Sequence, residues 1–135
     1  MTSAELRYLI AADELYDGKH GVKLIEIAAE RGVSKVSVYR AVERLEKNGY
    51  IERNEKNKVV LTEHGKKQLA DYMEIIAFIS SHLEKQCGIP KEIAYDDALN
   101  AACAFSDVSR ASIAQILKSG QLKCKDNATE VSEND

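Results

Sequence analysis

The chain has 135 residues, 44% of them hydrophobic, and a formal net charge of −3. This length suits one compact unit or two small ones, and no apolar run approaches the ~20 residues that a transmembrane helix needs. The N-terminus lacks a basic stretch followed by an apolar region, and three widely spaced cysteines do not make a disulfide framework. We therefore expect a cytoplasmic protein that does not bind membranes.

The charge is distributed unevenly along the chain. Residues 31–58 contain eight basic and four acidic side chains, a net charge of +4, so the remaining residues carry −7. Contacts with phosphates need a local basic face, and the charge of a whole chain is a poor guide to them. The sequence therefore favours nucleic-acid binding through residues 31–58.

The apolar periodicity of the first fifty residues predicts three helices. The first has an apolar stripe from Leu6 to Tyr16 and is expected to end around Asp17-Gly18, while the second is expected over 23–30 and the third over 34–47. Asn48-Gly49 follows the third, and this pair favours the left-handed backbone found beyond a helix end. Three short helices in a row suit a small DNA-binding domain.

The second and third predicted helices have the features of a helix-turn-helix, the motif that places its second helix in a DNA major groove. Gly32 lies in the turn, where we expect a positive φ. Either Ser34 or Ser37 is expected to cap the third helix. Its inward stripe, at helical spacing, is formed by Val38, Ala41, Val42 and Leu45.

Two short strands are predicted next, over 50–53 and 58–62, and a polar turn joins them as a β-hairpin. A long helix should then run from about Glu63 to Gln86, where Gly88 and Pro90 follow. Two shorter helices are expected, over about 91–104 and 106–117. Three helices followed by a hairpin make a winged helix-turn-helix.

The predicted fold class is mainly α, with an N-terminal winged helix-turn-helix and a helical dimerisation domain. We expect the first domain over 1–64 and the second over 65–118, with a disordered acidic tail over 119–135. Ile75 and Phe78 lie off the main apolar stripe of the long helix. We expect a homodimer because one small chain would not cover both of them.

The order of these elements resembles the diphtheria-toxin-repressor and manganese-transport-regulator family of iron- and manganese-dependent bacterial repressors. It does so over about residues 6–117. The resemblance rests on Ile27, Ala28, Glu30, Gly32, Val33 and Ser34, on the runs Val42–Ile51 and Leu61–Lys67, and on Gly88, Tyr95, Asp96, Asp97, Phe105 and Ser106. It implies a repressor whose homodimers bind palindromic operators when metal is present.

The family's metal-ligand positions are occupied differently in this sequence. Aligned by the resemblance, they hold Arg7, Ile10, Ile76 or Ala77, Leu99, Ala102 and Cys103. A transition-metal site needs several N, O or S donors, and of these residues only Cys103 supplies a suitable one. We therefore expect no metal cofactor and a regulator that is no longer metal-dependent.

A rearranged metal- or thiol-sensing site is the alternative. It would use Cys103, Cys87 and His82, with Cys124 as a further thiolate. Against it, a buried free cysteine usually behaves as a small hydrophobic residue, and no compact ligand spacing is present.

The residues expected to bind DNA are Ser34, Lys35, Val36, Ser37, Tyr39, Arg40, Arg44, Arg53, Lys56 and Lys58. Arg40 lies one turn into the third helix, where a guanidinium can reach guanine O6 and N7 together; otherwise it is an exposed helix charge. Tyr39 is expected either to touch the DNA or to fold over the wing. Phosphate contacts are also expected from the wing, through Arg53, Lys56, Asn57 and Lys58. The alternative is that these polar side chains only keep an exposed hairpin soluble.

The predicted function is a sequence-specific regulator that binds double-stranded DNA. We do not expect an enzyme, because the sequence holds no nucleophile–base arrangement, phosphate loop or paired-carboxylate site. The alternative from another class is a winged-helix protein-interaction module without DNA binding, since a fold does not fix a function.

Overall fold

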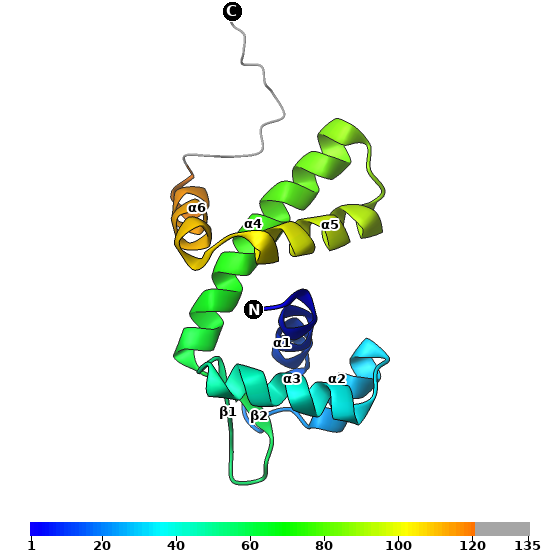
Figure 1. The fold of residues 1–135 in the computed structure, drawn as a ribbon, viewed down its shortest axis with the longest axis vertical. Helices are drawn as coiled ribbons and strands as arrows, with labels where there is room; N and C mark the ends of the chain where they lie inside the picture. The colour runs from blue at the N-terminus through cyan, green and yellow to red at the C-terminus, as the bar shows by residue number, and fades with distance from the viewer. Residues whose placement is uncertain (121–135) are drawn as a thin grey trace, which may run out of the picture. The chain divides into compact units, whose positions relative to one another are not determined.

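The computed structural model describes residues 1–120, which form six helices and a two-stranded antiparallel sheet (Figure 1). The chain divides into two compact units, one over Met1–Ala70 and one from Asp71 onward. The division falls inside the long helix, six residues after the boundary expected at 64. The tail predicted over 119–135 falls outside the described residues except for its first two positions, and so does Cys124.

The predicted fold class, mainly α with a winged helix-turn-helix, is confirmed. The elements are α1 (Ser3–Leu15), α2 (Leu24–Arg31), α3 (Lys35–Lys47), β1 (Ile51–Arg53), β2 (Val59–Leu61), α4 (Glu63–Cys87), α5 (Lys91–Ala104) and α6 (Asp107–Ser119). The first helix begins three residues before its apolar stripe and ends at Leu15, two residues before Asp17-Gly18, where its end was expected.

A capping box sets the start of α1. The Thr2 hydroxyl accepts a hydrogen bond from the backbone N–H of Glu5 at 3.1 Å, and the Thr2 N–H donates to the Glu5 carboxylate at 3.1 Å. These two bonds satisfy amides that would otherwise have no partner at a helix N-terminus. The helix therefore includes Ser3, ahead of the first apolar residue of its stripe.

The helix-turn-helix forms as predicted. Gly32 adopts a left-handed conformation with φ of 65°, and α3 starts after Ser34. Of the two serines considered as the cap, Ser34 fills the role, because its hydroxyl accepts from the Ser37 N–H at 3.2 Å. The expected inward stripe is buried, comprising Val38, Ala41, Val42 and Leu45. The orientation of α3 in its unit is thereby fixed, with its other side exposed.

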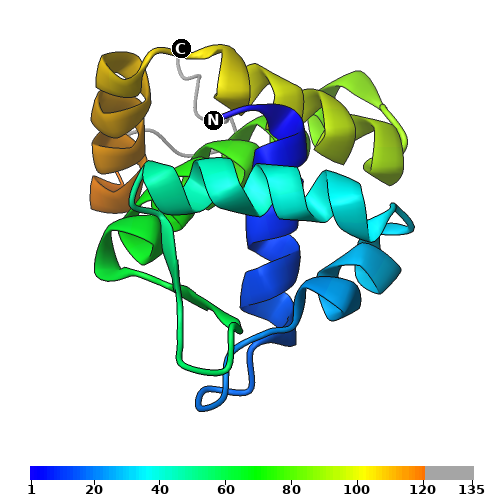
Figure 2. The ribbon, with the colours of Figure 1, turned by 60° about the horizontal axis from the view of Figure 1, so that its bottom comes forward.

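The wing is fastened to the loop that precedes α2. Within the hairpin, Ile51 pairs with Leu61 and Arg53 with Val59. Val59 also exchanges two backbone hydrogen bonds with Val22, at 2.9 and 2.8 Å. Figure 2 shows this loop beside the hairpin, near its turn. The segment around Val22 thus pairs with β2 from the side opposite β1, and this pairing stabilises a two-stranded hairpin that would be marginal alone.

The side chain of Asn54 organises the tip of the wing. Its amide nitrogen donates to the carbonyl of His20 at 3.0 Å, and its oxygen accepts from the N–H groups of Lys56 and Lys58, both at 3.0 Å. Asn57 has a positive φ of 62°, which asparagine tolerates better than most residues. The tip therefore presents its lysines from an ordered turn.

The junction between the wing and α4 is tightly packed. The Thr62 hydroxyl donates to the carbonyl of Gly49 at 2.6 Å and accepts from the N–H of Gly65 at 2.9 Å, so it caps α4. The Thr62 N–H donates to the carbonyl of Tyr50 at 3.1 Å. A Cβ added to Gly65 would lie 1.9 Å from that carbonyl oxygen. The first turn of α4 therefore needs glycine at this position.

The second unit has an apolar core around the remainder of α4. Its buried residues are Tyr72, Ile75, Ile76, Ala94, Ala98, Leu99, Ala102 and Ala114. The expectation that Ile75 needs a partner subunit to cover it was wrong, because Ile75 is fully buried in the single chain. Phe78 is half-buried, and its ring meets that of His82 edge to face.

A buried arginine joins the elements of the second unit. Arg110 of α6 lies with its guanidinium carbon 4.2 Å from the ring centroid of Tyr72 in α4. It donates to the carbonyl of Phe105 at 2.8 Å and pairs with Asp107. Its positive charge is therefore both paired and stacked on an aromatic ring, as a buried cation requires.

Candidate nucleic-acid interface

The first half of α3 exposes the side chains that were expected to read DNA. All five predicted residues in this helix half are exposed, and they are Lys35, Val36, Ser37, Tyr39 and Arg40. Val36 is 61% exposed although it is apolar. Because the opposite face of α3 is buried against its own unit, this surface is free to enter a groove. Ser34, at the cap, is exposed beside it.

Tyr39 contacts the wing, which is one of the two placements expected for this side chain. The guanidinium carbon of Arg53 lies 5.3 Å from the centroid of the Tyr39 ring. Arg53 also lies 3.5 Å from the Glu46 carboxylate, and its side chain is only 15% exposed. Tyr39 remains 45% exposed, so its ring is held by the wing and still faces solvent.

Arg44 is engaged within its own unit. Its Nε donates to the Glu5 carboxylate of α1 at 2.5 Å, and the Glu5 side chain is 7% exposed. Burial acts to raise the pKa of the Glu5 carboxyl, but hydrogen bonds from Arg44 and the Thr2 backbone, with the charge of Arg44, outweigh burial and lower it. The pair links α1 to the exposed side of α3, and a DNA contact by Arg44 stays a prediction.

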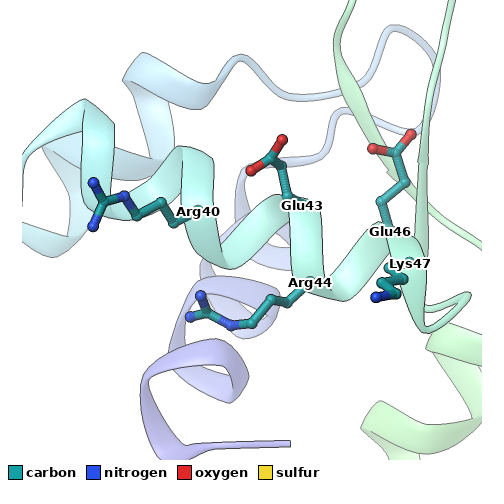
Figure 3. Close-up of a pocket in the computed structure, with 5 residues that line it drawn as sticks. All are labelled: Arg40, Glu43, Arg44, Glu46 and Lys47. Atoms are coloured by element: carbon teal, nitrogen blue, oxygen red, sulfur yellow. The ribbon is translucent and has the colours of Figure 1, made fainter.

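A groove of about 580 Å³ runs along the second half of α3. Figure 3 shows its five lining residues, Arg40, Glu43, Arg44, Glu46 and Lys47. Arg44 extends toward α1, whereas Glu43 and Glu46 point to another side of the helix. Two carboxylates in this groove make it a poor general site for a polyanion, so base reading through α3 falls to its first half.

A second groove, of about 350 Å³, lies between α2, α3 and the wing. Its lining residues are Lys23, Leu24, Ile25, Lys35, Tyr39, Lys56 and Asn57. It brings together three residues that the sequence analysis had assigned to DNA on separate grounds, Lys35, Tyr39 and Lys56. We call it the wing groove. Lys58 lies instead in a smaller hollow of about 230 Å³ on the wing, with Lys19 and His20.

Lys23 was not predicted from the sequence. It precedes α2, outside the +4 segment and outside the third helix, so no periodicity or motif pointed to it. The extra pairing of Val22 with Val59 brings the start of α2 next to the wing. This long-range contact and the hydrogen bond from Asn54 to the His20 carbonyl hold the loop before α2 against the wing, and sequence spacing carries no signal of either.

The residues at the family's metal-ligand positions do not fit a transition metal. Ile76, Leu99 and Ala102 are buried hydrocarbon. Within residues 1–120 there is no cluster of three or more His, Cys, Asp or Glu side chains that could hold an ion. Of the alternative ligands, Cys87 is exposed, Cys103 is half-buried, and His82 packs against Phe78.

Among the helices of residues 1–120, none is long and apolar enough to cross a membrane. No protein-family model matches the chain, and no curated protein matches it in sequence. Similarity to known proteins therefore comes from structure.

Solved structures of several regulators share this fold. The manganese regulator SloR superposes with a TM-score of 0.69 and 19% identity, over 87% of this chain and 55% of its own. IdeR from T. acidophilum superposes with a TM-score of 0.59 and 21% identity, over 92% of this chain and 56% of its own. A hypothetical protein from Sulfolobus solfataricus superposes with a TM-score of 0.67 and 20% identity, over 88% of this chain and 91% of its own.

The chain thus spans about half the length of the named regulators and nearly all of the Sulfolobus protein. Among the other structures that match is a manganese-dependent transcriptional repressor in complex with manganese, with a TM-score of 0.62. The resemblance to the diphtheria-toxin-repressor family is confirmed at the level of the fold: this chain has the winged-helix fold of the metal-dependent transcriptional regulators.

Proposed function

We propose that the protein is a sequence-specific regulator that binds double-stranded DNA as a homodimer and represses transcription. One observation carries the proposal. The exposed half of α3 and the wing border the same basic groove, so a helix fit for a major groove and a hairpin fit for the adjacent backbone belong to one surface. Proteins that share this fold include the metal-dependent transcriptional regulator MtsR and a manganese-dependent transcriptional repressor, which supports the same conclusion.

Two recognition helices related by a two-fold axis would enter major grooves one helical turn, ~34 Å, apart. Support for a dimer comes from apolar side chains that the second unit leaves exposed, namely Ile93, Val108 and Ile116. Exposed apolar residues in one small unit suit a subunit contact.

The test is a selection of DNA bound from a random pool by the full chain. A regulator of this kind should enrich a roughly palindromic site with half-sites one turn apart, and its affinity should fall steeply as salt is added. Enrichment of no motif, together with an affinity that barely responds to salt, would refute DNA binding. It would favour a winged-helix module that binds a protein.

DNA binding should be independent of metal. The family's ligand positions hold the buried apolar residues Ile76, Leu99 and Ala102, and residues 1–120 contain no other set of ligands for a metal ion. Metal binding therefore has no site from which it could change the affinity for DNA. We expect the same operator affinity in chelator and after addition of Mn²⁺, Fe²⁺ or Zn²⁺ in turn.

A tenfold gain with one metal, which corresponds to ~1.4 kcal/mol of coupling, would contradict metal independence. Repeating the titration with Cys103→Ser would then identify the source. If the gain disappears in that variant, the rearranged thiolate site becomes the better account; if it persists, the ion binds elsewhere.

A further inference from the structure

The lysines of the wing groove come from three separate parts of the first unit. Lys23 directly precedes α2, Lys35 is the first residue of α3, and Lys56 lies at the tip of the wing. The backbone is held in place at two of these lysines. Ser34 caps α3 next to Lys35, and Asn54 accepts a hydrogen bond from the N–H of Lys56. The groove is therefore built by the fold and not by one flexible basic stretch.

The wing groove differs in charge from the other two hollows of the first unit. Glu43 and Glu46 line the groove along α3, and Glu55 lines the hollow near His20. None of the seven described residues that line the wing groove is acidic. Three ammonium groups around one space of about 350 Å³ repel each other, and a bound anion would relieve that repulsion.

The rest of the lining suits a sugar–phosphate chain better than a free ion. Ile25 is 59% exposed and Tyr39 presents an aromatic ring that Arg53 holds in place, so the groove has an apolar side that deoxyribose can contact. Asn57 adds a polar side chain at the wing. Ammonium groups beside apolar surface are the combination that binds a nucleic-acid backbone.

The N-terminus of α2 does not supply the attraction. The N–H of Lys23 already donates to the Glu26 carboxylate at 2.9 Å, so this part of the helix end is satisfied within the protein. The positive charge of the groove is supplied by its three lysine side chains.

We propose that the wing groove is a phosphate clamp that holds the backbone of the DNA whose major groove α3 enters, and that Lys23 is one of its phosphate ligands. This inference rests on the proposed function and deepens it. The clamp fixes the position of the strand between α2 and the wing, while Arg40 and its neighbours on α3 read the bases. Lys23 contributes affinity at every sequence and no preference among sequences.

The experiment compares Lys23→Gln with Lys91→Gln in the full-length protein. Lys91 is an exposed lysine at the start of α5 that does not line the groove, so its replacement removes the same charge elsewhere. Operator affinity is measured over a range of salt concentrations. Lys23→Gln should reduce the slope of log affinity against log salt by ~0.9 for each half-site bound, and Lys91→Gln should leave it unchanged. The ratio of operator to scrambled-DNA affinity should be the same in all three proteins.

A second measurement identifies the phosphate itself. Single phosphates of the operator are replaced by neutral methylphosphonates, one position at a time. At one position per half-site the replacement should weaken the wild-type protein and have no effect on Lys23→Gln, which is the signature of a coupled pair. A wild-type slope and an unchanged phosphate map in Lys23→Gln would overturn the clamp and leave the proposed function standing. Failure of the wild-type protein to bind DNA would overturn both.

Discussion

Gly65→Ala should destabilise the first unit by about 3 kcal/mol, even though alanine is the better helix former. In an exposed helix, replacing glycine with alanine gains about 1 kcal/mol. Here the new Cβ would lie 1.9 Å from the Tyr50 carbonyl oxygen, which already accepts the Thr62 N–H. The first turn of α4 must move away from the wing, and the hydrogen bonds of Thr62 with it. The steric cost exceeds the gain in helix propensity.

Urea unfolding of the full chain, followed by circular dichroism, measures this loss. Ala70→Gly is the matched control, since Ala70 is an exposed position five residues further along the same helix. It should cost about 1 kcal/mol through helix propensity alone. If Gly65→Ala were as stable as the wild type or more so, the close approach of α4 to Tyr50 would be refuted.

The elements were predictable because their signals are local. Apolar spacing of three and four residues located the helices of the first unit and α4, Gly32 marked the turn before α3, and Ser34 was one of two serines considered as its cap. These features depend on a residue and its near neighbours in the chain. The start of α1 was missed by a few residues because a capping box, and not the apolar stripe, determines it.

The candidate site was predictable only in part, because its geometry depends on distant pairs. Arg44 was assigned to DNA as one more basic residue of α3, and nothing in the sequence indicated its ion pair with Glu5, thirty-nine positions away. The contact between Val22 and Val59 involves one residue of each segment, which leaves no periodic pattern. That contact brings Lys23 to the wing groove, so neither the groove nor its third lysine was accessible to sequence reasoning.

Ile75 illustrates a different kind of error. It was placed off the main stripe of α4, but it is buried with Leu69, Tyr72 and Ile76, and the inference that it needed a second subunit was wrong. An apolar residue off the stripe requires only some covering element. Other elements of the same chain cover Ile75, so a partner subunit is not needed for its burial.

Arg40→Ala should abolish recognition of one base pair in each half-site while the fold stays intact. Arg40 is exposed on α3, and no ion pair of its side chain is present within residues 1–120, so removing it costs the folded state little. A bidentate contact between arginine and guanine is worth ~1–3 kcal/mol of discrimination. Preference for guanine at one symmetric position should therefore fall by about tenfold to a hundredfold, as measured by competition between operators that differ at that position.

Arg40→Lys separates base reading from simple charge. Lysine keeps the positive charge but lacks the planar fork that meets O6 and N7 together, so we expect the salt dependence of the wild type with a weakened guanine preference. Lys23→Gln should give the reverse pattern, with a reduced salt slope and an intact preference. If Arg40→Ala instead lowered affinity equally for every sequence, Arg40 would be a phosphate ligand, and base reading would pass to the other exposed residues of α3.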